Sequence, residues 1–305
     1  MFKQHRLFSI FFKLLISMGA VYYIMYQVDM RLVLLILSKT KFYLLLILLV
    51  FTLINWFLEI KKWQYLASQA YPIDWLTAAR QSLVSFSVSM LTPNRVGEYG
   101  AKILFYPKEK RKQIFSLSLI GNISQMFVSL GLGLIALVSL LFTDDFKLKQ
   151  LLLNYWNQLV PSQRILILCG FLLLTILLLW IFWQFNSKKY ILTNPKIWSK
   201  SMIFSIFRYF VFSLQFLLLL WISVVPAPLH QLYLAIVLTY FFATLVPMLA
   251  FLDWAVKGSI AVLIFGILGS QKEIIVYIIS LMWCLNFALP FLVGLIWMWQ
   301  QKKRL

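Results

Sequence analysis

Residues that usually carry catalytic or metal chemistry are scarce in this chain. Its 305 residues include nine acidic residues, two histidines and two cysteines. The histidines, His5 and His230, lie near the ends of apolar runs, and no cluster of His, Cys, Asp and Glu has the spacing of metal ligands. We therefore expect no metal site, no catalytic triad and no cofactor. The sequence also lacks the ATP-binding pattern G-x-x-x-x-G-K-[ST].

Charged residues are also few. They make up 12% of the chain, against roughly 25% in a soluble domain, while 62% of residues are hydrophobic and the mean hydropathy is +0.88. The formal net charge of +19 could suggest a nucleic-acid partner, but the basic residues fall in short clusters between apolar runs. Membrane topology explains such clusters better, so we expect no nucleic-acid partner.

Apolar runs of about 20 residues, long enough to cross a bilayer core, recur from end to end. The sequence therefore predicts an all-α, polytopic helix bundle with a single integral membrane domain over residues 1–305. Cys169 and Cys284 each lie inside an apolar run, which favours packed thiols over a disulfide. Full spans are predicted at about 7–26, 42–60, 114–142, 164–185, 201–225 and 274–299.

Two further stretches predict broken or re-entrant helices. The region of about 75–105 is rich in polar residues and interrupted at Pro93 and Gly97. The region of about 231–270 is apolar but interrupted at Pro247, Asp253, Lys257 and Gly258. Broken backbone survives at membrane depth only where protein or a wet cavity satisfies it. With these regions the bundle has six to eight spans.

The distribution of basic residues predicts the orientation. We assume that each broken region returns to the side of the membrane from which it enters. Sixteen of the 28 Lys and Arg residues, Lys62 and Lys102 among them, then fall in cytoplasmic segments, and seven fall on the opposite side. Both termini are then cytoplasmic. The N-terminus resembles a signal peptide, but no small-residue cleavage site follows its apolar run, so we expect an uncleaved first span.

The order of elements also permits an inverted repeat. Each half, 1–150 and 151–305, reads as span, span, broken segment, span, and an odd number of crossings gives the halves opposite orientations. In transporters of this type, paired broken helices form a substrate site near the midplane. Because any six-span protein can be halved in this way, an arrangement without a repeat stays open.

The first broken region contains the segment TPNRVGEYG at residues 92–100. Arg95 and Glu98 are three residues apart, so they share a face of a helix that begins after Pro93, with Thr92 as its cap. One interpretation is a mutually neutralising pair that fixes the broken helix. The other, which we favour, is an anion site, because a guanidinium and the start of a helix both attract phosphate. Asn94 and Gly97 belong to the same candidate site.

The second broken region contains PMLAFLDWAVKGS at residues 247–259. Asp253 and Lys257 are four residues apart in the favourable order for an ion pair along a helix, so a local salt bridge is an open alternative to a binding role. If both broken helices point inward, Arg95, Glu98, Asp253 and Lys257 converge in one cavity. Such a cavity would suit a zwitterionic or phosphate-bearing headgroup.

Two charged residues outside the broken regions are weaker candidates for the same site. Arg208 lies inside the fifth predicted span, where it either reaches the interface or contacts an anionic headgroup. Glu59 lies at the end of the second span, where it either sits at the interface or faces the cavity.

The segment LTPNRVGEYGAKILFY resembles the Pro-x-Arg-x-Gly-Glu stretch of the lysylphosphatidylglycerol synthase membrane region, a flippase-like family of bacteria and archaea. VPMLAFLDWAVKGS resembles the second block of that family, usually a proline, a glycine-rich turn and Gly-x-Arg-Glu. Here Asp253 and Trp254 replace the glycine-rich turn, Lys257 stands at the arginine place and Gly258 at the glutamate place. The resemblance covers essentially the whole chain, without the soluble aminoacyl-transferase domain of fused members.

This resemblance implies a bacterial cytoplasmic (inner) membrane protein that moves an anionic or zwitterionic lipid, or a lipid-linked headgroup, between leaflets. Its partners would be membrane lipids. Two alternatives stay open. One is a non-catalytic accessory protein that binds lipid or a lipid-modifying partner enzyme. The other is a membrane enzyme in which a carboxylate pair such as Glu98 and Asp253 acts on a lipid-linked substrate.

Overall fold

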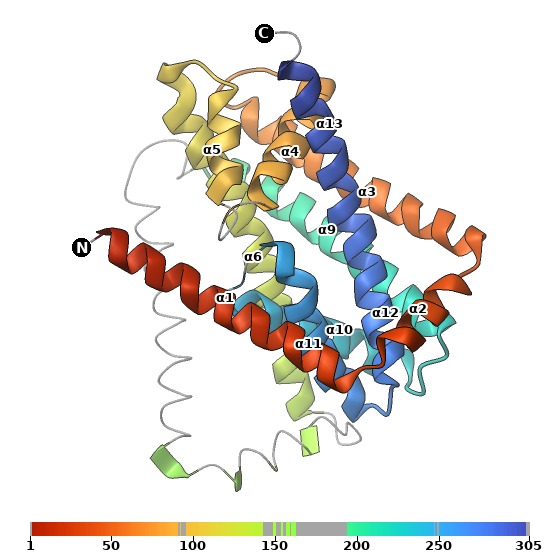
Figure 1. The fold of residues 1–305 in the computed structure, drawn as a ribbon. Coiled ribbons are helices and arrows are strands. Elements are labelled where there is room, and N and C mark those ends of the chain that lie inside the picture. Colours follow the sequence, from red (N-terminus) through yellow and green to blue (C-terminus); the bar gives the residue numbers. More distant parts are fainter. Residues whose placement is uncertain are drawn as a thin grey trace.

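The computed structural model describes residues 2–90, 92, 96–142, 149–150, 154, 157–158, 160–162, 194–246, 248 and 250–302. In this part of the chain every regular element is a helix (Figure 1), as the composition predicts. Five helical segments are long and apolar enough to cross a membrane, and a bent pair would make a sixth. The chain is therefore a multi-pass membrane protein. The predicted span at 164–185 lies outside the described residues.

The bent pair contains the first predicted span. The helix α1 (Phe2–Gln27) is followed by α2 (Met30–Ser38), and the two are bent by 80°. Asp29 caps α2, because its carboxylate accepts a hydrogen bond from the backbone N–H of Arg31 at 2.9 Å. The sequence did not predict α2, because its nine residues are too few for a membrane span.

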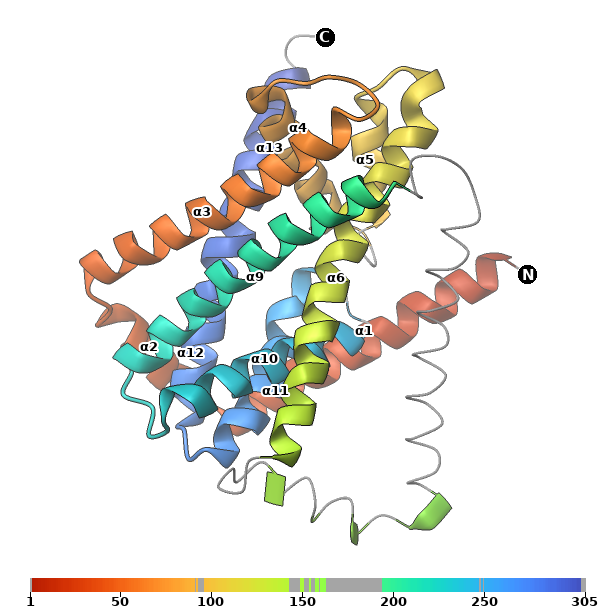
Figure 2. The ribbon, with the colours of Figure 1, turned by 180° about the vertical axis from the view of Figure 1, so that it is seen from behind.

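Two of the predicted spans are long helices that pack against each other. The helix α3 (Phe42–Ala67) continues past its predicted end at residue 60. The helix α9 (Pro195–Ile222) is capped by Asn194, whose side chain accepts from the backbone N–H of Lys196 at 3.0 Å. The two helices pack against each other and run in opposite directions (Figure 2).

The first broken region is a pair of short helices, α4 (Trp75–Met90) and α5 (Val96–Leu104), which we call the first hairpin. Their 16 and 9 residues are fewer than the roughly 20 needed to cross a bilayer core, and they pack against each other. The Thr92 hydroxyl accepts from the N–H of Gly97 at 2.8 Å, so Thr92 caps α5. The prediction that Gly97 interrupts the helix is wrong, since Gly97 lies inside α5. A side chain at this position would meet Thr92 Oγ1 at 2.6 Å and the Val88 carbonyl at 2.7 Å, so the close approach to α4 needs glycine.

The second broken region is built in the same way. We call it the second hairpin: α10 (Leu229–Leu245), a 3₁₀ turn (Ala250–Leu252) and α11 (Asp253–Ile267), with α10 and α11 in contact. The 3₁₀ turn together with α11 is long enough to count as a span. The prediction that Lys257 and Gly258 interrupt the helix is wrong. Both lie inside α11, because Lys257 is held by an ion pair to Asp253 and Gly258 lies against Ile24 of α1.

A long helical segment follows each hairpin. After the first hairpin come a 3₁₀ turn (Lys108–Lys110) and α6 (Arg111–Leu141). After the second come α12 (Lys272–Trp283), a π-helical turn (Cys284–Ala288) and α13 (Leu289–Lys302). The first hairpin lies toward the end of the molecule where the C-terminus is marked, and the second toward the opposite end (Figure 1).

The contacts between helices are reciprocal. The helix α4 packs against α3 and α13, and α10 packs against α9 and α6. In the same way α5 packs against α6, and α11 against α12. The first helix of each hairpin therefore contacts the long segment that follows the other hairpin, and the second helix contacts the long segment that follows its own.

Glycine permits the two cross-contacts to be close. A Cβ at Gly133 of α6 would overlap the ring of Phe241 on α10, and a Cβ at Gly294 of α13 would overlap Ser87 Oγ and the Leu83 carbonyl on α4. The Ser87 hydroxyl donates to the Phe291 carbonyl of α13 at 2.8 Å, which fixes α4 on α13. Small residues are the usual means of bringing two helices together within a bilayer.

We expect Gly294→Ala to lower the free energy of unfolding by about 1–3 kcal/mol, because the new methyl group meets backbone that cannot rotate away. Unfolding of the purified protein in mixed micelles of increasing SDS content measures this change. The matched control is Gly131→Ala on α6, where a Cβ meets nothing within 4 Å. This control gains helix propensity and is expected to be neutral or stabilised by up to about 1 kcal/mol. Equal stability of the two variants would contradict the close packing of α4 on α13.

Candidate functional site

A cavity of about 620 Å³ lies inside the bundle. Its walls come from both hairpins, from α3, α6 and α9, and from the π-helical turn. This volume is within the range of roughly 300–1,000 Å³ that small-molecule sites occupy. Among the described residues, no group of three His, Cys, Asp and Glu side chains could hold a metal ion.

The cavity brings together several residues that the sequence nominated. Glu98 of the first hairpin, Asp253 and Lys257 of the second hairpin, and Arg208 of α9 all line it. Gly97 precedes Glu98 in α5 and packs closely against Thr92 and the Val88 carbonyl. Glu59 does not line the cavity, but it forms an ion pair with Arg208, which does. Pro93, Asn94 and Arg95 lie outside the described residues, so the predicted Arg95–Glu98 pair stays a prediction.

Each hairpin carries one acid–lysine ion pair. Glu98 Oε1 lies 2.7 Å from Lys102 Nζ in α5, and Asp253 Oδ2 lies 2.6 Å from Lys257 Nζ in α11. Both pairs span four residues with the acid first, which is the favourable order along a helix. The expected local salt bridge at Asp253 is therefore present, and it leaves Lys257 on the cavity wall.

The two ion pairs have aromatic neighbours of the same kind. Lys102 Nζ lies 4.2 Å from the centre of the Trp63 ring, and Lys257 Nζ lies 4.8 Å from the centre of the Phe287 ring. Cation–π contacts of this kind help to hold a cation away from water. The sequences of the two ion pairs are also alike: GEYGAK and LDWAVK both place an aromatic residue directly after the acid and a lysine four residues after the acid.

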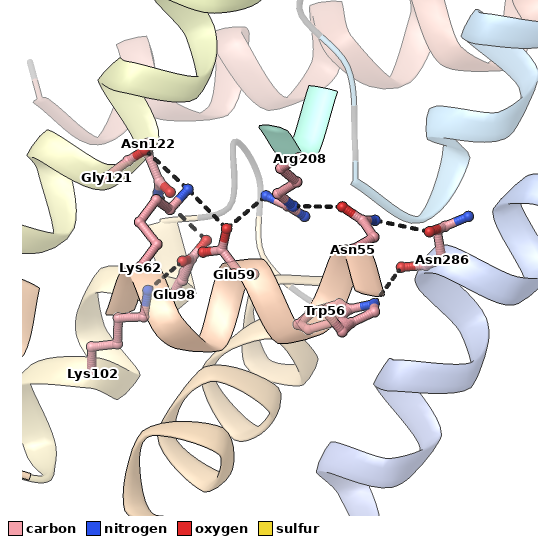
Figure 3. A network of polar contacts seen from close by, with 10 residues as sticks. All are labelled: Asn55, Trp56, Glu59, Lys62, Glu98, Lys102, Gly121, Asn122, Arg208 and Asn286. Carbon is pink, nitrogen blue, oxygen red and sulfur yellow. Dashed lines mark hydrogen bonds and ion pairs between the residues drawn. The ribbon is translucent and has the colours of Figure 1, made fainter. Parts of the chain in front are cut away.

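Arg208 belongs to a buried three-residue ion cluster (Figure 3). Its Nη1 donates to Glu59 Oε2 at 2.7 Å, and Lys62 Nζ lies 2.8 Å from the same oxygen. Lys62 is only 2% exposed. Lys62 and Lys102 are two of the residues that the charge distribution assigned to cytoplasmic segments. In the structure both are buried in ion pairs within the bundle, because α3 and α5 turn them toward carboxylates.

A row of amide side chains continues from Arg208. Arg208 Nε donates to Asn55 Oδ1 at 2.9 Å, and Asn55 Nδ2 donates to Asn286 Oδ1 at 2.9 Å (Figure 3). Asn286 Nδ2 in turn donates to Gln215 Oε1 at 2.9 Å. These three amides could not be recognised from the sequence, since each lies alone in an apolar segment and they meet only through contacts between distant helices.

Asn286 lies in the π-helical turn, which has a local cause. Pro290 lies four residues later and has no N–H to donate to the Asn286 carbonyl. The indole N–H of Trp56 donates to this carbonyl at 3.3 Å. A π turn in a long helix is frequently found at a functional site. Here it turns the Asn286 amide toward the same cavity that Arg208 lines.

The formal charges of the described residues at this site do not balance. Three carboxylates face four cations: Glu59, Glu98 and Asp253 against Lys62, Lys102, Arg208 and Lys257. Arg208 and Lys62 share one carboxylate oxygen, so the excess positive charge lies next to the cavity. Because uncompensated charge is costly inside a bilayer, this arrangement favours occupation by an anion.

Comparison of the sequence with protein-family models and with curated proteins gives no match.

Proposed function

We propose that this protein is a lipid flippase or transporter that moves a lipid with an anionic or zwitterionic headgroup between the leaflets of a bacterial cytoplasmic membrane. The observation that carries this proposal is the cavity with excess positive charge inside an otherwise apolar bundle. A phosphate entering the cavity would contact Arg208 and Lys257, whose carboxylate partners Glu59 and Asp253 hold them in place. The acyl chains would stay in the bilayer.

We further propose that the two hairpins belong to an inverted repeat. The reciprocal helix contacts, the antiparallel packing of α3 on α9 and the acid–lysine pair in each hairpin support this arrangement. In an inverted repeat the hairpins enter from opposite sides and the cavity lies between them. Rocking of one half against the other would open the cavity to each leaflet in turn.

Lipid scrambling in proteoliposomes tests the proposed function. We expect the native protein to move fluorescent lipids with a phosphate headgroup, and Arg208→Gln to slow this movement by about 10- to 100-fold, the worth of a charge-assisted hydrogen bond. The matched control is Lys196→Gln, an exposed cation on the same helix, which should move lipid at the native rate.

Two results would overturn the proposed function. One is an absence of movement for anionic, zwitterionic and polyprenyl-phosphate lipids alike. The other is equal rates for Arg208→Gln and Lys196→Gln. Co-purification with a partner enzyme in the absence of movement would favour an accessory protein, and a change in lipid mass would favour an enzyme.

Cysteine labelling tests the inverted repeat. We expect a membrane-impermeant maleimide to label Ser68→Cys, at the entry to the first hairpin, from one side of the membrane and His230→Cys, at the entry to the second, from the other. Both positions are exposed. The background carries Cys169→Ser and Cys284→Ser, and this cysteine-free chain is the control. Labelling of both positions from the same side would exclude hairpins of opposite orientation.

A further inference from the structure

One face of α6 lines the cavity with neutral polar groups. Asn122, Gln125 and Ser129 are spaced by three and four residues, so they project from one side of the helix, and all three contribute to the cavity wall. Asn122 Nδ2 donates to Glu98 Oε2 at 3.4 Å and so joins the charged network, whereas Gln125 and Ser129 are neutral wall groups that a purely ionic ligand would not need.

Two buried oxygen atoms that belong to residues of the cavity wall have no hydrogen-bond partner among the described residues. They are Tyr209 Oη on α9 and Gln125 Oε1 on α6, and both residues line the cavity. Tyr209 is 1% exposed and directly follows Arg208. Buried polar atoms in folded proteins nearly always have a partner, so a molecule in the cavity is expected to supply one. The Tyr209 hydroxyl can donate a hydrogen bond and the Gln125 carbonyl oxygen can accept one. This pair suits the hydroxyl groups of a ligand, because each hydroxyl group both donates and accepts.

Aromatic rings complete this side of the cavity. Phe212 and Tyr240 lie against each other with ring centres 4.2 Å apart, and both line the wall with Tyr209. Neutral amides and hydroxyls beside aromatic faces suit a ligand that has hydroxyl groups around a carbon skeleton. An ammonium headgroup fits less well, because the site already has an excess of formal positive charge.

We infer that the cavity contains a second subsite, formed by Gln125 and Tyr209, that binds the hydroxyl groups of a phosphorylated polyol, with the phosphate on Arg208. This inference rests on the proposed function only where the polyol phosphate is the headgroup of a transported lipid. The same chemistry is present in a free polyol phosphate, so the test has a soluble arm and a lipid arm.

The soluble arm measures binding to the purified protein in detergent by calorimetry. The probes are myo-inositol 1-phosphate and methyl phosphate, which share the phosphate and differ in hydroxyl groups. We expect inositol phosphate to bind about tenfold more tightly. Tyr209→Phe and Gln125→Leu should each reduce this preference by about three- to tenfold, the worth of one or two neutral hydrogen bonds, while binding of methyl phosphate stays unchanged.

The unfolding midpoint of Tyr209→Phe distinguishes a hydroxyl group that binds a ligand from one that stabilises the fold. Because Tyr209 Oη has no partner in the described structure, its removal should leave the unfolding midpoint of the empty protein unchanged or raised. Tyr43→Phe, at an exposed tyrosine, is the control. A lowered midpoint for Tyr209→Phe, equal binding of the two phosphates, or a preference that survives both variants would overturn the subsite.

The lipid arm compares the scrambling of fluorescent phosphatidylinositol with that of phosphatidylmethanol, which has the same charge without the ring hydroxyls. Faster movement of phosphatidylinositol, lost in Tyr209→Phe, supports both the subsite and the flippase. Preferential binding of inositol phosphate without movement of either lipid supports the subsite for a free polyol phosphate and contradicts the flippase. Equal movement of both lipids, with equal binding of the soluble phosphates, supports the flippase and overturns the subsite.

Discussion

Glu59→Gln is expected to lower the free energy of unfolding by about 3–5 kcal/mol, because it leaves two cations inside the bundle without their shared carboxylate. Lys62 Nζ and Arg208 Nη1 both contact Glu59 Oε2, at 2.8 Å and 2.7 Å, and neither forms an ion pair with another carboxylate of the described residues. A neutral amide cannot offset two positive charges in a low dielectric. SDS unfolding in mixed micelles, followed by circular dichroism, measures the loss.

The double variant Glu59→Gln with Lys62→Met is the matched control. It removes one cation together with the carboxylate, so it leaves Arg208, whose side chain is 24% exposed and also donates to Asn55. We expect it to regain most of the lost stability, since a methionine fills the space of the lysine stem without a charge. A single variant as stable as the native protein, or a double variant less stable than the single, would contradict the shared-carboxylate arrangement.

The second large effect is expected from exchanging the acid and the base of the second hairpin. The variant Asp253→Lys with Lys257→Asp keeps an ion pair four residues apart but moves the cation by one helical turn. We expect lipid scrambling to fall by about 10- to 100-fold, because a phosphate in the cavity loses its contact with Lys257. The free energy of unfolding should change by no more than about 1 kcal/mol, the combined effect of pair order and the helix dipole.

This exchange separates the two interpretations of the pair. If Asp253 and Lys257 only stabilise α11, the exchanged pair stabilises it equally and scrambling stays at the native rate. If Lys257 contacts the headgroup, scrambling stays low even though the fold is intact. The single variant Lys257→Gln is the control: it should lose scrambling to a similar extent, because it removes the same cation without reversing the pair.

The sequence by itself determined that the protein is a multi-pass helical membrane protein and that two of its regions are interrupted. These properties are local. A run of about 20 apolar residues needs no partner to prefer the bilayer. The helices on either side of each interruption, α4 and α5 in one region and α10 and α11 in the other, match the predicted ranges. The ion pair of Asp253 with Lys257 was predictable for the same reason, since helical geometry alone places residues four apart on one face.

The tertiary structure decided which polar groups meet. By position, Lys62 and Lys102 looked like interfacial cations at the ends of apolar runs. Their burial depends on where α3 and α5 lie in the bundle, which composition and spacing do not reveal. Asn55 and Asn286 are 231 residues apart and share a hydrogen bond only because α3 packs against the π-helical turn. The cavity exists because helices from both halves leave space between them, so its charge balance is a property of the packed bundle.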